Sequence, residues 1–243
     1  MATMRKSLGT ILSDFLMAVS SKRHMTEEEP SLLQAILGIY NNITYSDSMP
    51  DSIMSFLLDD DSTSEAIRLL KAKLENTNPL CLKLLNNPIS YLLDELICNI
   101  QQHAQTKMGY AYMGYDSSTD MIEAVIADQG ITIYGSYVAA QKHLDMLDDT
   151  DASALNLAQS GYSIKDLPET ENRGYGISSN IRMIVEGLNG EFALFSGNAL
   201  LFQFSERKKI LSLPPETDFK GTMIIVRFPA MLPNNFSLYN FIG

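Results

Sequence analysis

The clearest pattern of apolar and polar positions lies between residues 89 and 104. Apolar residues recur there every three to four positions, as on one face of a helix: Ile89, Leu92, Leu93, Leu96, Ile97 and Ile100. Glu95, Asn99 and His103 are spaced four residues apart and form a second stripe beside that apolar face. The spacing predicts a helix over Tyr91–Ala104 with a carboxylate, an amide and an imidazole at the rim of the core.

The N-terminal part of the chain shows shorter helical patterns, separated by turn-rich segments such as Asn41-Asn42. The predicted helices are Leu8–Val19, Leu32–Tyr40, Pro50–Leu58 and Ser64–Leu74. We therefore expect two parts, a helical N-terminal region at 1–82 and a second domain at 83–243.

After the central helix the pattern changes to short strands. They are predicted at Gly109–Tyr115, Met121–Ala127, Glu191–Phe195, Ala199–Phe204 and Thr222–Phe228. A long connector, residues 131–173, is expected to be helical at Val138–Leu147 and loop-like afterwards, and another helix follows Gly176. This order predicts an α+β fold, a two-layer sandwich in which a mixed, mostly antiparallel sheet is backed by helices, with a helical N-terminal extension.

Charge and composition narrow the environment. The net charge of -11 argues against non-specific binding to nucleic acid or to an anionic membrane, because both need a basic surface. Cys81 and Cys98 make neither a disulfide framework nor a metal site. No apolar run reaches the roughly 20 residues that span a bilayer, and Asp14 interrupts the one near the N-terminus. We expect a cytoplasmic protein without nucleic-acid or membrane partners.

Three further segments carry polar or glycine motifs at the ends of predicted elements. Asp128-Gln129-Gly130 directly follows an apolar strand. Gly174-Tyr175-Gly176 forms a turn that opens a helix, and Arg173 precedes it. Lys220-Gly221-Thr222 comes before the last predicted strand. Each motif alone is a weak signal, but the three fit a pocket at the rim of the core beside the central helix.

With the stripe on the central helix, these segments resemble, in order, the N, G1, G2 and G3 boxes of the Bergerat-fold (GHKL) ATPases, the family of gyrase, Hsp90, histidine kinases and MutL. The resemblance covers roughly residues 83–229. It implies a histidine-kinase-like ATP-binding domain, with ATP and Mg²⁺ as cofactors and a lid at about 131–173.

The resemblance also implies roles for the residues of the first two boxes. Glu95 would act as general base, and Asn99 would bind Mg²⁺ through its amide oxygen. His103 would either contact phosphate or only satisfy a hydrogen bond at the pocket edge. Asp128 would accept the adenine amino group, and Gly130 would let the backbone approach the ring.

In the other two boxes, Gly174 and Gly176 would offer backbone N–H groups to the triphosphate, beside Arg173, and Thr222 would bond the base edge directly or through water. The same residues also have plain structural interpretations, as turn, cap or strand-start residues. Two features depart from the family pattern: Thr132 stands where glycine or alanine is usual, and residues 145–172 hold seven acidic residues against one lysine.

Among family members, the layout resembles stand-alone anti-sigma-factor-type serine/threonine kinases. The chain ends soon after its last predicted strand, and the sequence around His24 lacks the spacing of a histidine kinase's phospho-acceptor hairpin. Glu95 would then activate a hydroxyl on a partner protein, and residues 1–82 would dock that partner or form a homodimer. The alternatives are a nucleotide-binding or degenerate interaction module without catalysis, a histidine-kinase catalytic domain with a separate phospho-acceptor, and a scaffold that binds no nucleotide.

Overall fold

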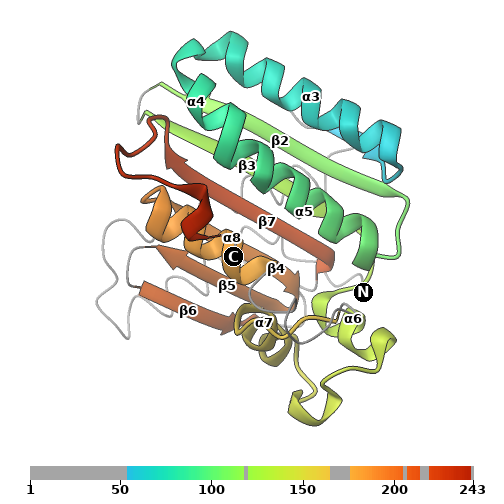
Figure 1. The fold of residues 1–243 in the computed structure, drawn as a ribbon. Helices are drawn as coiled ribbons and strands as arrows, with labels where there is room; N and C mark the ends of the chain where they lie inside the picture. The colour runs from blue at the N-terminus through green and yellow to red at the C-terminus, as the bar shows by residue number, and fades with distance from the viewer. Residues whose placement is uncertain (1–53, 118–119, 165–175, 205–206, 214–218, 242–243) are drawn as a thin grey trace, which may run out of the picture. The chain divides into compact units, whose positions relative to one another are not determined.

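The structure is a computed structural model that describes residues 54–117, 120–164, 176–204, 207–213 and 219–241 (Figure 1). Backbone contacts divide the chain into Met1–Ile53 and Met54–Gly243, and everything below concerns the second unit. The helices predicted at Leu8–Val19 and Leu32–Tyr40 lie outside the described residues.

A seven-stranded sheet forms the body of this unit. Its strands are β1 Met54–Leu57, β2 Met108–Asp116, β3 Met121–Asp128, β4 Glu191–Gly197, β5 Ala199–Phe204, β6 Arg207–Ser212 and β7 Phe219–Pro229. The order across the sheet is β1-β2-β3-β7-β4-β5-β6, and every pairing between these described strands is antiparallel. The mixed sheet we expected is therefore wrong: β3 and β4 run in the same direction, but β7 lies between them and separates them.

Helices cover one face of the sheet, which confirms the α+β class and the backing of the sheet by helices (Figure 1). On that face lie α3 Asp60–Thr77, α4 Leu82–Leu84, α5 Ser90–His103 and α8 Ile177–Arg182. Two others, α6 Ile133–Ala140 and α7 Asp151–Gln159, lie near one end of the strands. The shorter turns are the 3₁₀ segments η1 Pro79–Cys81, η3 Leu144–Met146 and η6 Leu238–Asn240, and the π segments η2 Leu85–Ile89 and η4 Met183–Gly187.

The central helix α5 forms where the apolar spacing predicts it, one residue earlier at each end. Its apolar stripe is buried against alternate residues of the neighbouring strands, among them Ile122, Ala124, Ile126, Ile224 and Val226. Because side chains alternate across a strand, only every second residue of β3 and β7 faces this helix layer. α5 is therefore fixed in position and orientation by its apolar side.

The predicted helix Pro50–Leu58 and the predicted boundary at residue 82 both differ from the structure. Met54–Leu57 is the edge strand β1, which pairs with β2, and the ring of Phe56 lies where a side chain on Gly109 would be. α3 packs on β2. The compact unit therefore begins at Met54, because β1 and α3 complete the sheet edge and its helix layer.

The connector also differs from the prediction. Its first helix starts at Ile133 because the Thr132 hydroxyl accepts the N–H of Gly135 at 3.1 Å, an N-cap bond, and it ends at Gln141, whose φ of 53° is left-handed. The expected helix at Val138–Leu147 is therefore wrong beyond Ala140. We missed α7, capped by Thr150, and the strand β6.

Truncating Leu93 to alanine should lower the free energy of unfolding by about 2–5 kcal/mol, because this α5 side chain is 0% exposed. Urea unfolding measures this loss of free energy, and an unchanged m-value shows that the variant differs in stability alone. Leu80→Ala is the matched control, since Leu80 is 88% exposed and its loss should stay within about 0.5 kcal/mol. Equal losses in the two variants would contradict the burial of α5.

Candidate functional site

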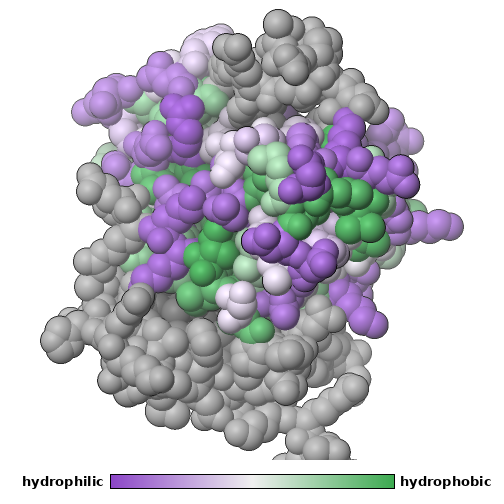
Figure 2. All heavy atoms as spheres, turned by 90° about the horizontal axis from the view of Figure 1, so that it is seen from below, coloured by the Kyte–Doolittle hydropathy of each residue, from purple (hydrophilic) through white to green (hydrophobic). Residues whose placement is uncertain are grey.

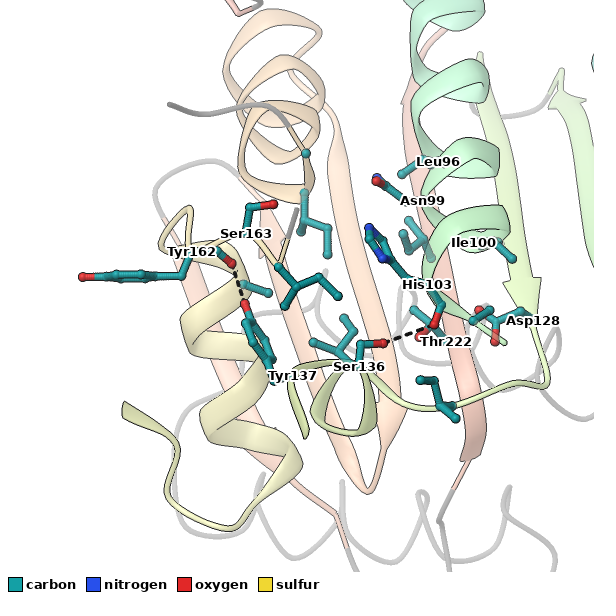
Figure 3. A pocket seen from close by; sticks show the side chains of 18 of the residues that line it. Leu96, Asn99, Ile100, His103, Asp128, Ser136, Tyr137, Tyr162, Ser163 and Thr222 are labelled. Atoms are coloured by element: carbon teal, nitrogen blue, oxygen red, sulfur yellow. Dashed lines mark hydrogen bonds between the residues drawn. The ribbon is translucent and has the colours of Figure 1, made fainter. Parts of the chain in front are cut away.

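A cavity of about 120 Å³ opens between α5, the ends of β3 and β7, and the connector (Figure 3). On the same measure one water needs roughly 10–15 Å³, so the space holds a small organic group. Most of its lining is apolar: Leu96, Ile100, Ala104, Ile131, Ile133, Tyr137, Ala158, Ile164, Ile177 and Ile224. The polar residues on it are Asn99, His103, Asp128, Ser136, Tyr162, Ser163, Ser178 and Thr222.

Asp128 is the buried carboxylate of this cavity. It is the last residue of β3, it is 1% exposed, and its Oδ1 accepts the N–H of Gly130 at 2.8 Å. The backbone N–H of Thr222 donates a second hydrogen bond to it. Burial raises the pKa of Asp128 to about 7, although the two N–H groups act to lower it. A carboxylate with unused lone pairs at an apolar cavity is well placed to accept from a ligand.

A bulge in β7 makes that arrangement possible. Ser196 pairs with Thr222, but the next pair is Gly197 with Phe219, so Lys220 and Gly221 have no partner in β4. Gly221 has φ of 110°, and a Cβ on it would lie 2.2 Å from the Asp128 carbonyl oxygen. Only glycine allows β7 to pass this close to Asp128.

Gly130 does not line the cavity. A Cβ on it would overlap the carbonyl oxygen of Ala104, which closes the end of α5 and also accepts the N–H of Ile131 at 2.8 Å. Its missing side chain therefore lets the turn after β3 pack on α5. Thr132, the departure from the family pattern, is the N-cap of α6.

The polar stripe on α5 divides into two parts. Asn99 and His103 line the cavity and point into it (Figure 3), one turn apart. Glu95, a further turn toward the N-terminus of α5, is partly buried and does not line the cavity. The structure therefore brings two of the three stripe residues to the cavity with Asp128 and Thr222.

The connector forms the opposite wall, and hydrogen bonds hold it there. The Tyr137 hydroxyl donates to the carbonyl oxygen of Tyr162 at 2.6 Å, and His143 Nε2 lies 3.1 Å from the carbonyl oxygen of Ser163. Tyr137 is 2% exposed, whereas the ring of Tyr162 points away from the cavity (Figure 3). The wall at 161–164 is thus anchored to α6 and to the turn that follows it.

The four described acidic residues of the connector, all between positions 145 and 151, do not line the cavity. Asp145, Asp148 and Asp149 are exposed, and Asp151 instead accepts the N–H of Asn198 at 3.1 Å. Figure 2, seen from the end where α6 and α7 lie, shows hydrophobic and hydrophilic residues interspersed on this surface. Among the described lining residues, Asp128 is the sole carboxylate.

Gly176 lines the cavity just before α8, with φ of 137°. Arg173 and Gly174 lie outside the described residues. Five predicted site residues therefore meet at one cavity: Asn99, His103, Asp128, Gly176 and Thr222. We missed Ser136 and Tyr137 on α6, since that helix was itself misplaced, and no spacing signal marks them.

No family model matches the sequence, and no curated protein matches it. The function has to be inferred from the cavity itself. Within the described residues no group of three or more His, Cys, Asp or Glu side chains could hold a metal, and no described helix is long and apolar enough to cross a bilayer.

The raised pKa of Asp128 should make stability depend on pH. The folded protein keeps the proton up to about pH 7, whereas the unfolded chain releases it near the ordinary 3.8. Between these values the folded state binds more protons, so the free energy of unfolding falls as pH rises, by up to about 4 kcal/mol in total. Urea unfolding of the wild type and Asp128→Asn at pH 4–8 isolates this group, because other titrations cancel in the difference. A difference that is constant with pH would show that Asp128 ionises normally.

Proposed function

We propose that this cavity binds the adenine ring of ATP and that the protein is a Mg²⁺-dependent regulatory ATPase or protein kinase of the GHKL type. The observation that carries the proposal is the buried Asp128 carboxylate at an apolar cavity, held by the N–H groups of Gly130 and Thr222. Adenine is a flat apolar ring with an amino donor at its edge. It matches such a cavity in both shape and hydrogen bonding.

The phosphate end of the ligand would lie toward Asn99. Asn99 points into the cavity, and its amide oxygen is a ligand that Mg²⁺ accepts beside water and phosphate oxygens. Bound Mg²⁺ would supply charge neutralisation of the phosphates. Asn99 itself carries no charge, so we expect nucleotide binding at this end of the cavity to depend on the metal.

Glu95 would perform the chemistry. In this proposal its carboxylate takes the proton of a water or of a partner protein's hydroxyl as that oxygen attacks the γ-phosphorus. The bond from the γ-phosphorus to the bridging oxygen breaks, and ADP leaves. A partner hydroxyl as acceptor makes the protein a signalling kinase, and water makes it an ATPase.

A nucleotide-binding module without turnover is the second candidate. The observation that favours it is that Glu95 does not line the cavity, whereas Asn99 and His103 do. Such a protein would use ATP only to switch an interaction with another protein. Binding and turnover therefore have to be measured separately.

Calorimetric titration with ATP, with and without Mg²⁺, tests the binding. We expect micromolar binding that requires Mg²⁺, loss of the metal-dependent part in Asn99→Ala, and a fall of about ten- to a hundredfold in the preference for ATP over GTP in Asp128→Ala. Asn86→Ala, an exposed asparagine in η2, is the matched control and should bind as the wild type does. Absence of wild-type binding at millimolar ATP would refute the proposal.

Glu95→Gln separates the two candidates. For a catalytic protein we expect ATP affinity within about twofold of the wild type and turnover lowered by about 10²–10⁴-fold, because the general base is gone. Asp94→Asn, one residue away on the exposed side of α5, controls for the loss of a carboxylate. Wild-type turnover in Glu95→Gln would remove Glu95 from the mechanism. Absence of turnover in the wild type, with ATP binding intact, would favour the module.

A further inference from the structure

Ser196 lies behind the cavity and is tied to Thr222. It is 1% exposed and sits on β4 at the bulge. Its Oγ accepts the N–H of Ile133 at 2.9 Å and lies 3.1 Å from the carbonyl oxygen of Gly221 and 3.4 Å from the hydroxyl of Thr222. Thr222 lines the cavity and Ser196 does not, so Ser196 can affect a ligand only through its neighbours.

The direction of each hydrogen bond follows from counting protons. A carbonyl oxygen only accepts, so the single proton of Ser196 points to Gly221. The N–H of Ile133 occupies one lone pair of Ser196, and the other faces the Thr222 hydroxyl. In this contact, which is long for two hydroxyls, Thr222 must therefore be the donor, and a Thr222 proton used in this way leaves the lone pairs of its oxygen for the cavity.

The bulge supplies the group that fixes this direction. Since Gly221 has no partner in β4, its carbonyl oxygen is available to the Ser196 hydroxyl. In an unbroken ladder that oxygen would accept a backbone N–H instead, and the Ser196 proton would be free to point at Thr222. Whether the Thr222 hydroxyl donates toward Ser196 thus depends on two residues, Ser196 and Gly221, which do not themselves line the cavity.

We propose that Ser196 is a positioning residue that makes Thr222 an acceptor, so that Thr222 and Asp128 together select a ligand edge that donates. An exocyclic amino group, as on adenine, fits this pair. A ring carbonyl at the same place, as on inosine, meets two acceptors and is rejected. This inference rests on the proposed function, because it specifies which nucleotide base that cavity prefers.

The test compares the affinities of ATP and ITP, which carry an amino group and a carbonyl at the same ring position. Titrations at pH 8.5 keep Asp128 ionised, since its pKa is about 7. In Ser196→Ala the Thr222 proton is released and can turn to the inosine carbonyl. The preference of the wild type for ATP should then fall about three- to tenfold, the effect of one hydrogen bond.

A second variant guards against misfolding, because Ser196→Ala leaves the N–H of Ile133 and the carbonyl of Gly221 unpaired. Ser196→Cys keeps a donor and acceptor atom at this position, in a somewhat larger side chain, and weakens the bonds, so it should lower the preference in the same direction. In a Thr222→Val background neither change at Ser196 should alter the preference further, because Ser196 acts through that hydroxyl. Ser90→Ala, which removes a hydroxyl bound to Leu85 and Lys71, is the matched control and should leave the preference unchanged.

The outcomes separate the two proposals. A wild type that binds neither nucleotide overturns the proposed function and this inference with it. A wild type that prefers ATP, with the same preference in Ser196→Ala and Ser196→Cys, overturns the role of Ser196 alone. A loss of preference that persists in the Thr222→Val background shows that Ser196 acts structurally and also overturns its role.

Discussion

The buried carboxylate of Asp128 is the constraint on which the rest of the site depends. A charge 1% exposed at an apolar cavity is costly unless backbone donors reach it. Two segments supply them: the turn that places Gly130 N–H at 2.8 Å and the bulged strand that brings Thr222 N–H within reach. Each approach needs a glycine, because a Cβ on Gly130 would meet α5 and one on Gly221 would meet Asp128 itself. The need to bring N–H groups to the Asp128 carboxylate thus gives a reason for Gly130, for Gly221 and for the bulge in β7.

The connector shows how the rest of the cavity is kept in shape around that carboxylate. The bonds from Tyr137 to Tyr162 and from His143 to Ser163 hold residues 161–164 against α6 and the turn after it, and Thr132 caps the start of α6. A wall secured at several points loses less entropy when a ligand binds than a free loop does. Through residue 164, then, the segment we expected to be a lid is part of the built site.

The sequence predicts the parts of the fold that local periodicity determines. α5 and β3 are long and strongly patterned, so their elements, and the positions of Asn99, His103 and Asp128 on them, follow from spacing. β1 has four residues and forms because β2 offers a partner, which no local pattern reveals. The role of Ser196 is harder still to predict from the sequence, because its position beside Thr222 depends on the register of β4 against β7 and on the bulge in β7. Both the formation of β1 and the position of Ser196 depend on pairing between strands that are far apart in the sequence, which no short stretch of sequence reveals.

The position of Glu95 outside the cavity follows from helix geometry, and it is compatible with a catalytic role as well as with a module without turnover. On α5 the cavity lining runs from Leu96 to Ala104, so Glu95 is not excluded by its distance along the axis. At about 100° per residue, Glu95 instead lies about 40° round the helix from Asn99, beyond the side that lines the cavity. Asp128 lies near the C-terminal end of α5, where Ala104 contacts the turn after β3. A nucleotide with its base at Asp128 would extend its phosphates along α5, past Asn99 and toward Glu95. Base recognition and chemistry would then occur about two turns apart on one helix, so the residue proposed to react need not touch the pocket that binds the base.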